Sequence, residues 1–412
     1  MEATFERLVA PSLRLASRIG PMHTAATYVN LASLLLHASP PVGSRIGVFS
    51  YGSGAASTMY ALRVRGEARV DAAALVGMLD ARKVLPPSDF VAVCDRFSAT
   101  YGRFDWTPRV RGVSPARSYR IKAVGVLGRR EYEYIGPAVN ATPEICFCPI
   151  ALPPTSPPLP SRHAGLHALE VYVPRHAVSA AELETAHGVP GKYTVGLRMA
   201  EWAACDEDED VVSMALTAVR RLVEAQGLRY EDVGMLQVGT ESLLDRSKSV
   251  KSHLMALFAP HGCANVEGID CYHACYGGTA ALLACANWVE SSAWDGRWAI
   301  AVCTDVSDAP KQYPFMNGAA CVAMLVGPDA PLALEAGRVS HIVHEWDFYK
   351  PVGWPTMGPI VDGPGSMEVY FSCLAACQRE VEARGGGTFV DAHDFLVFHP
   401  VSYTHLTLPT KA

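Results

Sequence analysis

The feature that most constrains the fold is an alternation of short apolar runs with longer helical segments in the second half of the chain. The apolar runs occupy residues 168–173, 235–239, 298–303 and 322–327. The helical segments between them occupy 210–227 and 278–292. Strands separated by helices of this length favour crossover connections and a buried, mostly parallel sheet. The sequence therefore predicts an α/β fold.

The first part of the chain has a similar pattern. Helical segments at 5–17 and 24–38 precede strand-like runs at 45–50 and 58–64, which flank a glycine-rich turn. Seven prolines lie between Pro143 and Pro160 in a stretch without helical spacing, which is typical of a linker. We therefore predict two α/β blocks, 1–136 and 164–400, joined by a Pro-rich linker at 137–163. Residues 401–412 continue neither a strand nor an amphipathic helix.

Composition excludes several classes of function. The net charge of −6 gives no basic surface for nucleic acid or an anionic membrane, and no apolar run is long enough to span a bilayer. Twelve dispersed cysteines favour free thiols in a reducing compartment. No pair of CxxC motifs occurs, and Cys146 and Cys148 form a lone CxC. The sequence thus predicts a cytoplasmic protein without nucleic-acid, membrane or metal partners.

One turn of the predicted fold carries a candidate catalytic residue. Cys275 lies just before Gly277, Gly278 and a long helix of small and apolar residues. A helix N-terminus favours a thiolate and raises its nucleophilicity, and the nearby amides can hold an oxyanion. The glycines would let a substrate approach the backbone. The alternative interpretation is that Cys275 is one more core thiol, like Cys285.

Two further residues follow apolar strands. Glu241 comes directly after the run at 235–239, where α/β sheets place their sites, and partial burial is expected to raise its pKa towards that of a general base. The alternative is a solvated loop acid. His399 ends the apolar run at 395–398 and is either a proton donor or a core histidine whose hydrogen bonds are satisfied.

These residues lie within long motifs. The segments 165–184, 238–258, 269–281 and 346–351 closely resemble the eukaryotic type of the 3-hydroxy-3-methylglutaryl-CoA (HMG-CoA) synthase family, in the thiolase-like superfamily. The resemblance implies a thiolase-like fold of two pseudo-repeated halves and a homodimer. It also implies condensation of acetyl-CoA with acetoacetyl-CoA to HMG-CoA, in isoprenoid or sterol precursor supply, with these CoA thioesters as substrates and no cofactor.

The same resemblance implies roles for residues. Cys275 falls on the acylated nucleophile, Glu241 on the general acid/base, and His399 on the histidine that positions acetoacetyl-CoA. The supporting positions are Asp305, Asp362, Ser53, Tyr276 and Gly277, and the substrate-binding positions are Lys192 and Thr279.

The chain departs from the family in order and in detail. Residues 1–136 resemble the family's C-terminal part and 164–400 its N-terminal part, as expected of tandem copies joined by a linker or of an assembly error. A family stretch between these parts is absent, and 401–412 resembles a translated sequencing adapter. The family motif Gly-Asn-Met-Tyr-Thr reads Gly-Pro-Met-His-Thr, which puts Pro21 in place of an active-site asparagine, and the loop at 311–321 also differs.

These departures leave an alternative open. The chain is either a synthase or an inactive fragment or pseudo-enzyme that only associates with a partner. Other thiolase-like condensing enzymes, such as β-ketoacyl synthases and thiolases, lack the glutamate of the "VGTES" motif at 238–242. The sequence argues against them.

Overall fold

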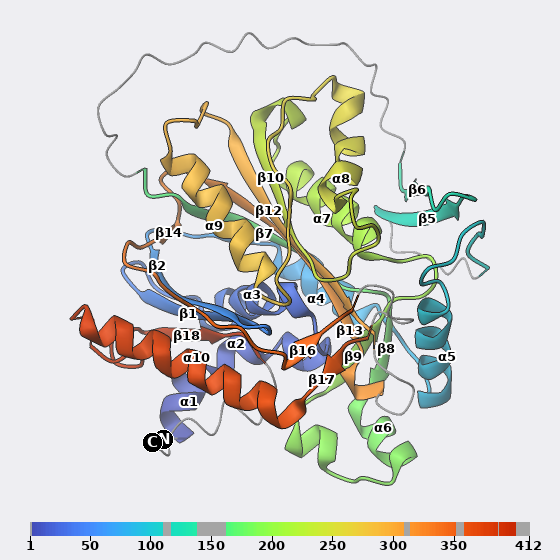
Figure 1. Ribbon diagram of the computed structural model, residues 1–412, viewed down its shortest axis with the longest axis horizontal. Coiled ribbons are helices and arrows are strands. Elements are labelled where there is room, and N and C mark those ends of the chain that lie inside the picture. The colour runs from blue at the N-terminus through green and yellow to red at the C-terminus, as the bar shows by residue number, and fades with distance from the viewer. Residues whose placement is uncertain are drawn as a thin grey trace.

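The computed structural model describes residues 2–109, 117–137, 162–308, 314–351, 358–385 and 387–400. Its centre is an 11-stranded sheet built from both sequence blocks (Figure 1). The spatial order is β11 (Asp270–Cys271), β10 (Val233–Gly239), β12 (Trp298–Ser307), β13 (Gly318–Gly327), β7 (Gly165–Tyr172), β14 (Leu332–Leu334), β2 (Ala56–Val64), β1 (Arg45–Gly52) and β18 (Phe395–Phe398). β15 (Val339–Ile342) pairs with β2, and β3 (Arg69–Val70) pairs with β7.

The sheet is mixed, whereas the sequence predicted a mostly parallel one. β10 is parallel to β11 and β12, and β1 is parallel to β18. The pairs from β12 through β13, β7, β14 and β2 to β1 are all antiparallel. A strand that is buried on both faces has the same apolar pattern in either direction, so the sequence pattern could not distinguish them. The α/β architecture itself is confirmed.

Helices lie on both sides of this sheet and between its two halves. α3 (Ala26–Ala38) and α9 (Gly277–Glu290) share one apolar core with strands of both blocks. α7 (Val211–Ala225) and α8 (Val250–Phe258) pack against the strands of the second block in a separate core. α10 (Gly363–Ala383) covers β1, β2 and β18 (Figure 1). α3 and α9 therefore form the inner layer.

Smaller elements complete the described chain. The helices are α1 (Glu2–Leu8), α2 (Ala10–Leu13), α4 (Ala72–Asp80), α5 (Pro87–Ser98) and α6 (Ala180–His187). The outlying strands are β4 (Lys83–Val84), β5 (Ser118–Val124), β6 (Arg130–Ile135), β8 (His176–Ser179), β9 (Glu201–Ala204), β16 (Phe348–Tyr349) and β17 (Ile360–Val361). The helix predicted at 5–17 is broken after Leu8, since Pro11 has no amide hydrogen to continue it and begins α2 instead.

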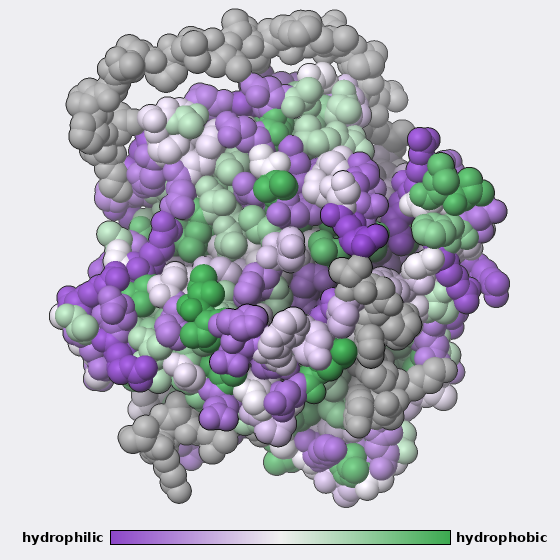
Figure 2. Space-filling view, viewed as in Figure 1, coloured by the Kyte–Doolittle hydropathy of each residue, from purple (hydrophilic) through white to green (hydrophobic). Residues whose placement is uncertain are grey.

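Apolar side chains fill the interior. Figure 2 shows hydrophilic and hydrophobic residues interspersed over the visible face, without one continuous apolar surface.

The ten cysteines in the described ranges are all free, as predicted. None of the described helices is long and apolar enough to cross a bilayer. Three predicted features lie outside the described residues: the CxC pair, the tail, and the linker apart from its two ends.

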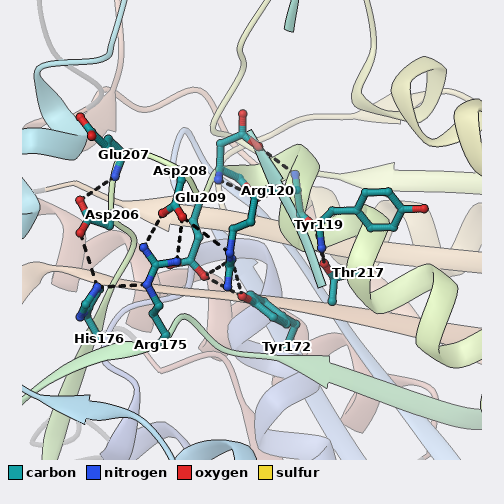
Figure 3. Close-up of polar contacts among 12 residues, drawn as sticks. Tyr119, Arg120, Tyr172, Arg175, His176, Asp206, Glu207, Asp208, Glu209 and Thr217 are labelled. Carbon is teal, nitrogen blue, oxygen red and sulfur yellow. Dashed lines mark hydrogen bonds and ion pairs between the residues drawn. The ribbon is translucent and has the colours of Figure 1, made fainter. Parts of the chain in front are cut away.

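An acidic run, Asp206 to Asp210, is buried at the junction of the two blocks (Figure 3). We call it the acidic run. Its last member, Asp210, caps α7 by accepting from the backbone amides of Val212 and Ser213 at 3.0 and 2.8 Å. An acid at this position also complements the partial positive charge of the helix start. Gly227, with φ of 62°, follows the end of the helix as predicted.

The other acids of the run pair with basic residues. Arg96 donates to both oxygens of Asp206, at 3.1 and 2.9 Å. Arg175 donates to both oxygens of Asp208, at 3.0 and 2.5 Å. Glu209 accepts from Arg120 at 2.7 Å and from the Tyr172 hydroxyl at 2.6 Å (Figure 3). Because Arg96 and Arg120 come from the first block, these bonds tie the two blocks together.

Candidate active site

Three side chains capable of acid, base or nucleophilic chemistry meet at the end of β10. The Cys275 thiol donates to Oε2 of Glu241 at 3.5 Å and lies 3.6 Å from Nδ1 of His23. The same His23 nitrogen lies 3.5 Å from Oε1 of Glu241. We call these three residues the Cys–His–Glu cluster. The sequence predicted Cys275 and Glu241, and the structure brings them into direct contact.

Asp305 on β12 holds this cluster in place. Its Oδ1 accepts from the backbone amides of Glu241 and Ser242 at 2.8 and 3.0 Å, and from the Thr240 hydroxyl at 2.9 Å. Its Oδ2 accepts from the backbone amide of Thr24, next to His23, at 3.0 Å. Asp305 is completely buried. It therefore connects the loop carrying Glu241 with the segment carrying His23.

Glycines let the backbone segments of the site approach one another. A Cβ on Gly239, at the end of β10, would lie 2.4 Å from the backbone of Gly278. A Cβ on Gly277 would lie 2.7 Å from the carbonyl oxygen of Cys271. We expected these helix glycines to admit a substrate to the backbone. In the structure they instead admit neighbouring protein segments, and this close packing places Cys275 beside Glu241.

The environment of Cys275 does not favour its thiolate. Cys275 lies just before Tyr276, the residue at the N-terminal end of α9. Burial and the nearby carboxylates of Glu241 and Asp305 raise the pKa of the Cys275 thiol well above its usual value. The prediction that the helix N-terminus would favour a thiolate was therefore wrong, because desolvation and two negative neighbours outweigh it. A proton acceptor is needed when the sulfur attacks.

Glu241 is such an acceptor. Burial alone would raise its pKa, but the charge of His23 when that ring is protonated, together with the Lys350 ammonium, outweighs burial and lowers the pKa of Glu241 to about 2. Lys350 Nζ lies 2.8 Å from Oε1 of Glu241. Our expectation of a raised pKa was wrong because it took burial into account without the lysine. Burial lowers the pKa of His23, so its imidazole is neutral near pH 7.

His23 and Lys350 are the functional candidates that sequence reasoning missed. His23 comes from the first block and is nine-tenths buried, with its ring edge-on to Phe348 at 5.9 Å. A signal for it existed, because His23 stands at the tyrosine of the family's Gly-Asn-Met-Tyr-Thr motif. Lys350 belongs to the "WDFYKP" motif at 346–351. Only tertiary contact shows that it faces Glu241.

His399 lies close to this cluster. It follows β18, is buried, and its Nδ1 is 3.5 Å from the Thr27 hydroxyl of α3. Burial, with a further contribution from His23, lowers the pKa of His399 to about 4. The ring is therefore neutral near pH 7, with one N–H that can donate. The backbone of His399 is fixed by a hydrogen bond of 2.8 Å that its amide donates to the carbonyl oxygen of Phe49.

Three other predicted positions surround the corner. Thr279 in α9 shares hydrogen bonds of 2.7 Å with Tyr28 and with Ser50. The Tyr276 hydroxyl lies 2.6 Å from that of Thr58. Ser53 occupies the turn between β1 and β2, and a Cβ on the adjacent Gly52 would lie 2.4 Å from the Tyr276 amide nitrogen. These residues lock α9 against the first block.

Two predicted site residues lie apart from the cluster. Asp362 is exposed and caps α10, accepting from the Gly365 amide at 3.2 Å. The Lys192 ammonium lies over the rings of Tyr193 and Phe315, at 5.8 and 5.5 Å from their centres.

Pro21, which replaces the family's asparagine, packs against Gly318, and a Cβ on Gly318 would lie 2.2 Å from the Pro21 carbonyl oxygen. Part of the altered loop, residues 311–313, lies outside the described ranges.

Comparison with known proteins identifies two family segments. The profile described as hydroxymethylglutaryl-coenzyme A synthase N terminal matches residues 160–331. The profile described as hydroxymethylglutaryl-coenzyme A synthase C terminal matches residues 1–134. The C-terminal part therefore precedes the N-terminal part, in the order that the sequence indicated.

Individual proteins give the same result. Hydroxymethylglutaryl-CoA synthase erg13B of Aspergillus fumigatus is 48% identical over 226 residues, covering 54% of this chain and 49% of that protein. The mitochondrial synthase of Sus scrofa is 43% identical over 287 residues, covering 63% and 56%. A solved structure of MvaS in complex with 3-hydroxy-3-methylglutaryl coenzyme A is 36% identical, with a TM-score of 0.50 over 54% of each chain.

The chain thus spans about half the length of the curated relatives that it matches. The two profiles together nevertheless account for most of its residues, 1–134 and 160–331. On this evidence the chain belongs to the hydroxymethylglutaryl-CoA synthase family.

Proposed function

We propose that this chain condenses acetyl-CoA with acetoacetyl-CoA to give HMG-CoA, through an acetyl-cysteine at Cys275. The observation that carries the proposal is the direct contact of the Cys275 thiol with Oε2 of Glu241 at 3.5 Å. A nucleophile and a base within hydrogen-bond reach of each other are the minimum that acyl transfer requires. The MvaS relative, solved with HMG-CoA, supports the choice of product.

The first step is transfer of the acetyl group. The sulfur of Cys275 attacks the thioester carbon of acetyl-CoA, and the thiol proton passes to Glu241 or to the neutral His23. The carbon–sulfur bond to CoA breaks, and CoA leaves after taking up a proton. Acetyl-Cys275 remains. Because the pKa of the thiol is raised, this proton transfer accompanies the attack rather than preceding it.

The second step forms the carbon–carbon bond. The Glu241 carboxylate removes a proton from the methyl group of acetyl-Cys275, and the resulting carbanion attacks the ketone carbon of acetoacetyl-CoA. The neutral His399 ring donates a hydrogen bond to the ketone oxygen as negative charge develops on it. The proton that Glu241 removed passes to this oxygen, which becomes the hydroxyl of the product, and Glu241 is a carboxylate again. Lys350, beside Glu241, adds a positive charge to the same region. Water then hydrolyses the thioester to Cys275, which releases HMG-CoA and the free thiol.

The wider assignments belong to the same proposal. We place the reaction in the mevalonate pathway, as part of isoprenoid and sterol precursor supply, with CoA thioesters as the small-molecule partners and a homodimer as the assembly. We propose the cytoplasm as the location, which ten free cysteines in the described ranges support. Sedimentation of the full chain tests the assembly, since a monomer at micromolar concentration would contradict it.

The test separates acylation from condensation. Labelled acetyl retained on the protein and HMG-CoA formed are measured side by side for three variants. Cys275→Ser should lose both, because a hydroxyl ionises far less readily than a thiol. Glu241→Ala should still acetylate, since His23 can accept the thiol proton, but should lose condensation by about 10²–10⁴-fold. His399→Ala should acetylate normally and require more acetoacetyl-CoA.

The competing candidate is an inactive relative that only associates with a partner. The place of the family's asparagine is taken by Pro21, which favours this candidate because proline has no side-chain amide. An unmodified chain that is folded, yet never retains labelled acetyl, would establish it and reject the proposed synthase activity. Normal condensation by Glu241→Ala would instead reject the role given to Glu241.

A further inference from the structure

We propose that His23, Glu241 and Cys275 form a binding site for a thiophilic divalent cation, best fitted by Zn²⁺, which blocks the Cys275 sulfur. The site takes the metal as an inhibitory ligand and not as a cofactor. The inference needs only the geometry of the Cys–His–Glu cluster and is independent of whether the chain condenses CoA thioesters.

The distances within the cluster carry the argument. One ligand atom from each residue lies within 4.8 Å of the other two. Sγ of Cys275 is 3.6 Å from Nδ1 of His23 and 3.5 Å from Oε2 of Glu241. Zinc bond lengths of about 2.0–2.3 Å at tetrahedral angles require ligand atoms about 3.3–3.6 Å apart. The sulfur therefore already has the spacing that a tetrahedral ion needs from both other ligand atoms, and Nδ1 of His23 lies 3.5 Å from the second Glu241 oxygen, Oε1.

The chemical identity of the three ligands selects the metal. A thiolate, an imidazole nitrogen and a carboxylate oxygen are together a zinc ligand set, whereas Mg²⁺ and Ca²⁺ prefer oxygen alone. Three protein ligands leave one position for water. The Cys275 thiol loses its proton to solvent when the metal–sulfur bond forms.

The third ligand, His23, distinguishes this chain from the family motif. In the family motif Gly-Asn-Met-Tyr-Thr the corresponding residue is tyrosine, which has no ring nitrogen to offer, and here the motif reads Gly-Pro-Met-His-Thr. The His23 side chain is buried and faces both other ligands. A synthase with tyrosine at this position would hold only two of the three ligands.

Lys350 is expected to lower the affinity of this site for a metal ion. Its ammonium lies 2.8 Å from Oε1 of Glu241, so Oε2 is the oxygen left for a metal. The ammonium repels an incoming cation, and its removal should tighten metal binding. The side chain of Lys350 is 21% exposed. It can therefore move towards solvent as a metal enters.

Cobalt provides the test, because a thiolate bound to Co²⁺ gives a charge-transfer absorption band. The full chain is prepared metal-free with Cys146→Ser and Cys148→Ser, which removes the CxC pair as a competing site. We expect one equivalent of Co²⁺ to produce the band and Zn²⁺ to displace it. Bound Zn²⁺ should also protect Cys275 from alkylation by iodoacetamide.

Variants in the same background identify the ligands. Cys275→Ser should abolish the band, and His23→Tyr should weaken binding by more than about 100-fold, since even outer partners of metal ligands are worth 10–100-fold. Lys350→Met should tighten binding by about tenfold or more. Cys263→Ser is the matched control, because Cys263 is also a half-buried thiol near a histidine, and it should leave binding unchanged.

Three outcomes would overturn the inference: no stoichiometric Co²⁺ binding, a band that persists in Cys275→Ser, or unchanged affinity in a His23→Tyr variant that melts like its parent. A chain that binds Zn²⁺ but, when metal-free, never retains labelled acetyl would support this site and reject the proposed synthase activity. A chain that acetylates but binds no metal would do the reverse.

Discussion

The acidic run at 206–210 and the Cys–His–Glu cluster are both buried groups of charge, but their partners differ. In the acidic run, Asp206 and Asp208 each receive an arginine fork, and Glu209 receives an arginine and a tyrosine hydroxyl. In the cluster, Glu241 contacts a thiol, a neutral imidazole and one flexible ammonium.

This difference separates structure from chemistry. A guanidinium does not give up its proton and its fork fixes a carboxylate in direction, so the arginine pairs of the acidic run hold the structure together without moving protons. Asp206 is the member of the run that also has a titratable neighbour, since Nε2 of His176 lies 3.4 Å from it. A thiol, an imidazole and an ammonium can each exchange a proton. Buried acids alone therefore do not mark a site, and the titratable character of their partners does.

The largest expected effect is on stability in the acidic run. Glu209→Gln removes the charge that faces Arg120 and Arg175, both of which are almost fully buried. Losing one partner of a buried ion pair costs about 3–5 kcal/mol. Urea denaturation of this variant should show that loss. A change below about 1 kcal/mol would remove the distinction drawn between the two regions.

A smaller effect, dependent on pH, is expected at Glu170, a largely buried acid of β7 whose ion-pair partner among the described residues is Arg221, 4.0 Å away. Burial raises the pKa of Glu170 from 4.5 to about 7. The folded state thus binds an extra proton between these values, and stability should fall as pH rises through that window.

Glu170→Gln should remove this fall and stabilise the protein at pH 8 by roughly 1–3 kcal/mol. Thermal melts of the parent and the variant at pH 5 and pH 8 provide the comparison. Parallel pH dependence in the two proteins would show that Glu170 does not titrate in this range.

The smallest stability effect is expected at Glu241. Glu241→Gln is the matched counterpart of Glu209→Gln, but its cationic partner Lys350 can reach solvent once released. The free energy of unfolding should fall by less than in Glu209→Gln, while condensation is lost. Denaturation and product formation measured on one preparation check both. A stability loss equal to that of Glu209→Gln would mean that Glu241 is a structural ion-pair partner.

Much of the fold could be predicted from local pattern. The runs at 235–239, 298–303 and 322–327 became β10, β12 and β13, and the helical segments became α7 and α9. Strand direction could not be predicted, because burial on both faces removes the alternation that would reveal it. The connection between β12 and β13 spans only 308–317, too short for a crossover helix, and so reverses the chain.

The site could be predicted only in part, and the reason differs from that for the fold. Cys275 and Glu241 follow their own motifs, but the signs of their pKa shifts depend on neighbours far away in the sequence. His23 is 252 residues from Cys275, and no local spacing predicts that contact. Asp362 illustrates the converse, since the side chain of this residue, matched from the family motif, accepts from the Gly365 amide of the helix that it caps.

The pairing of β1 with β18 has a consequence for how the chain is made. Ile46 is paired with Phe395, and the Arg45 amide donates to Asp394, 349 residues later. A pairing of this separation has a large loop-closure cost and slows folding. During synthesis the hairpin of β1 and β2 emerges early, with one edge unpaired until Phe395–Phe398 is translated. For most of translation, the nascent chain therefore exposes an open sheet edge, where pairing with another chain would lead to aggregation.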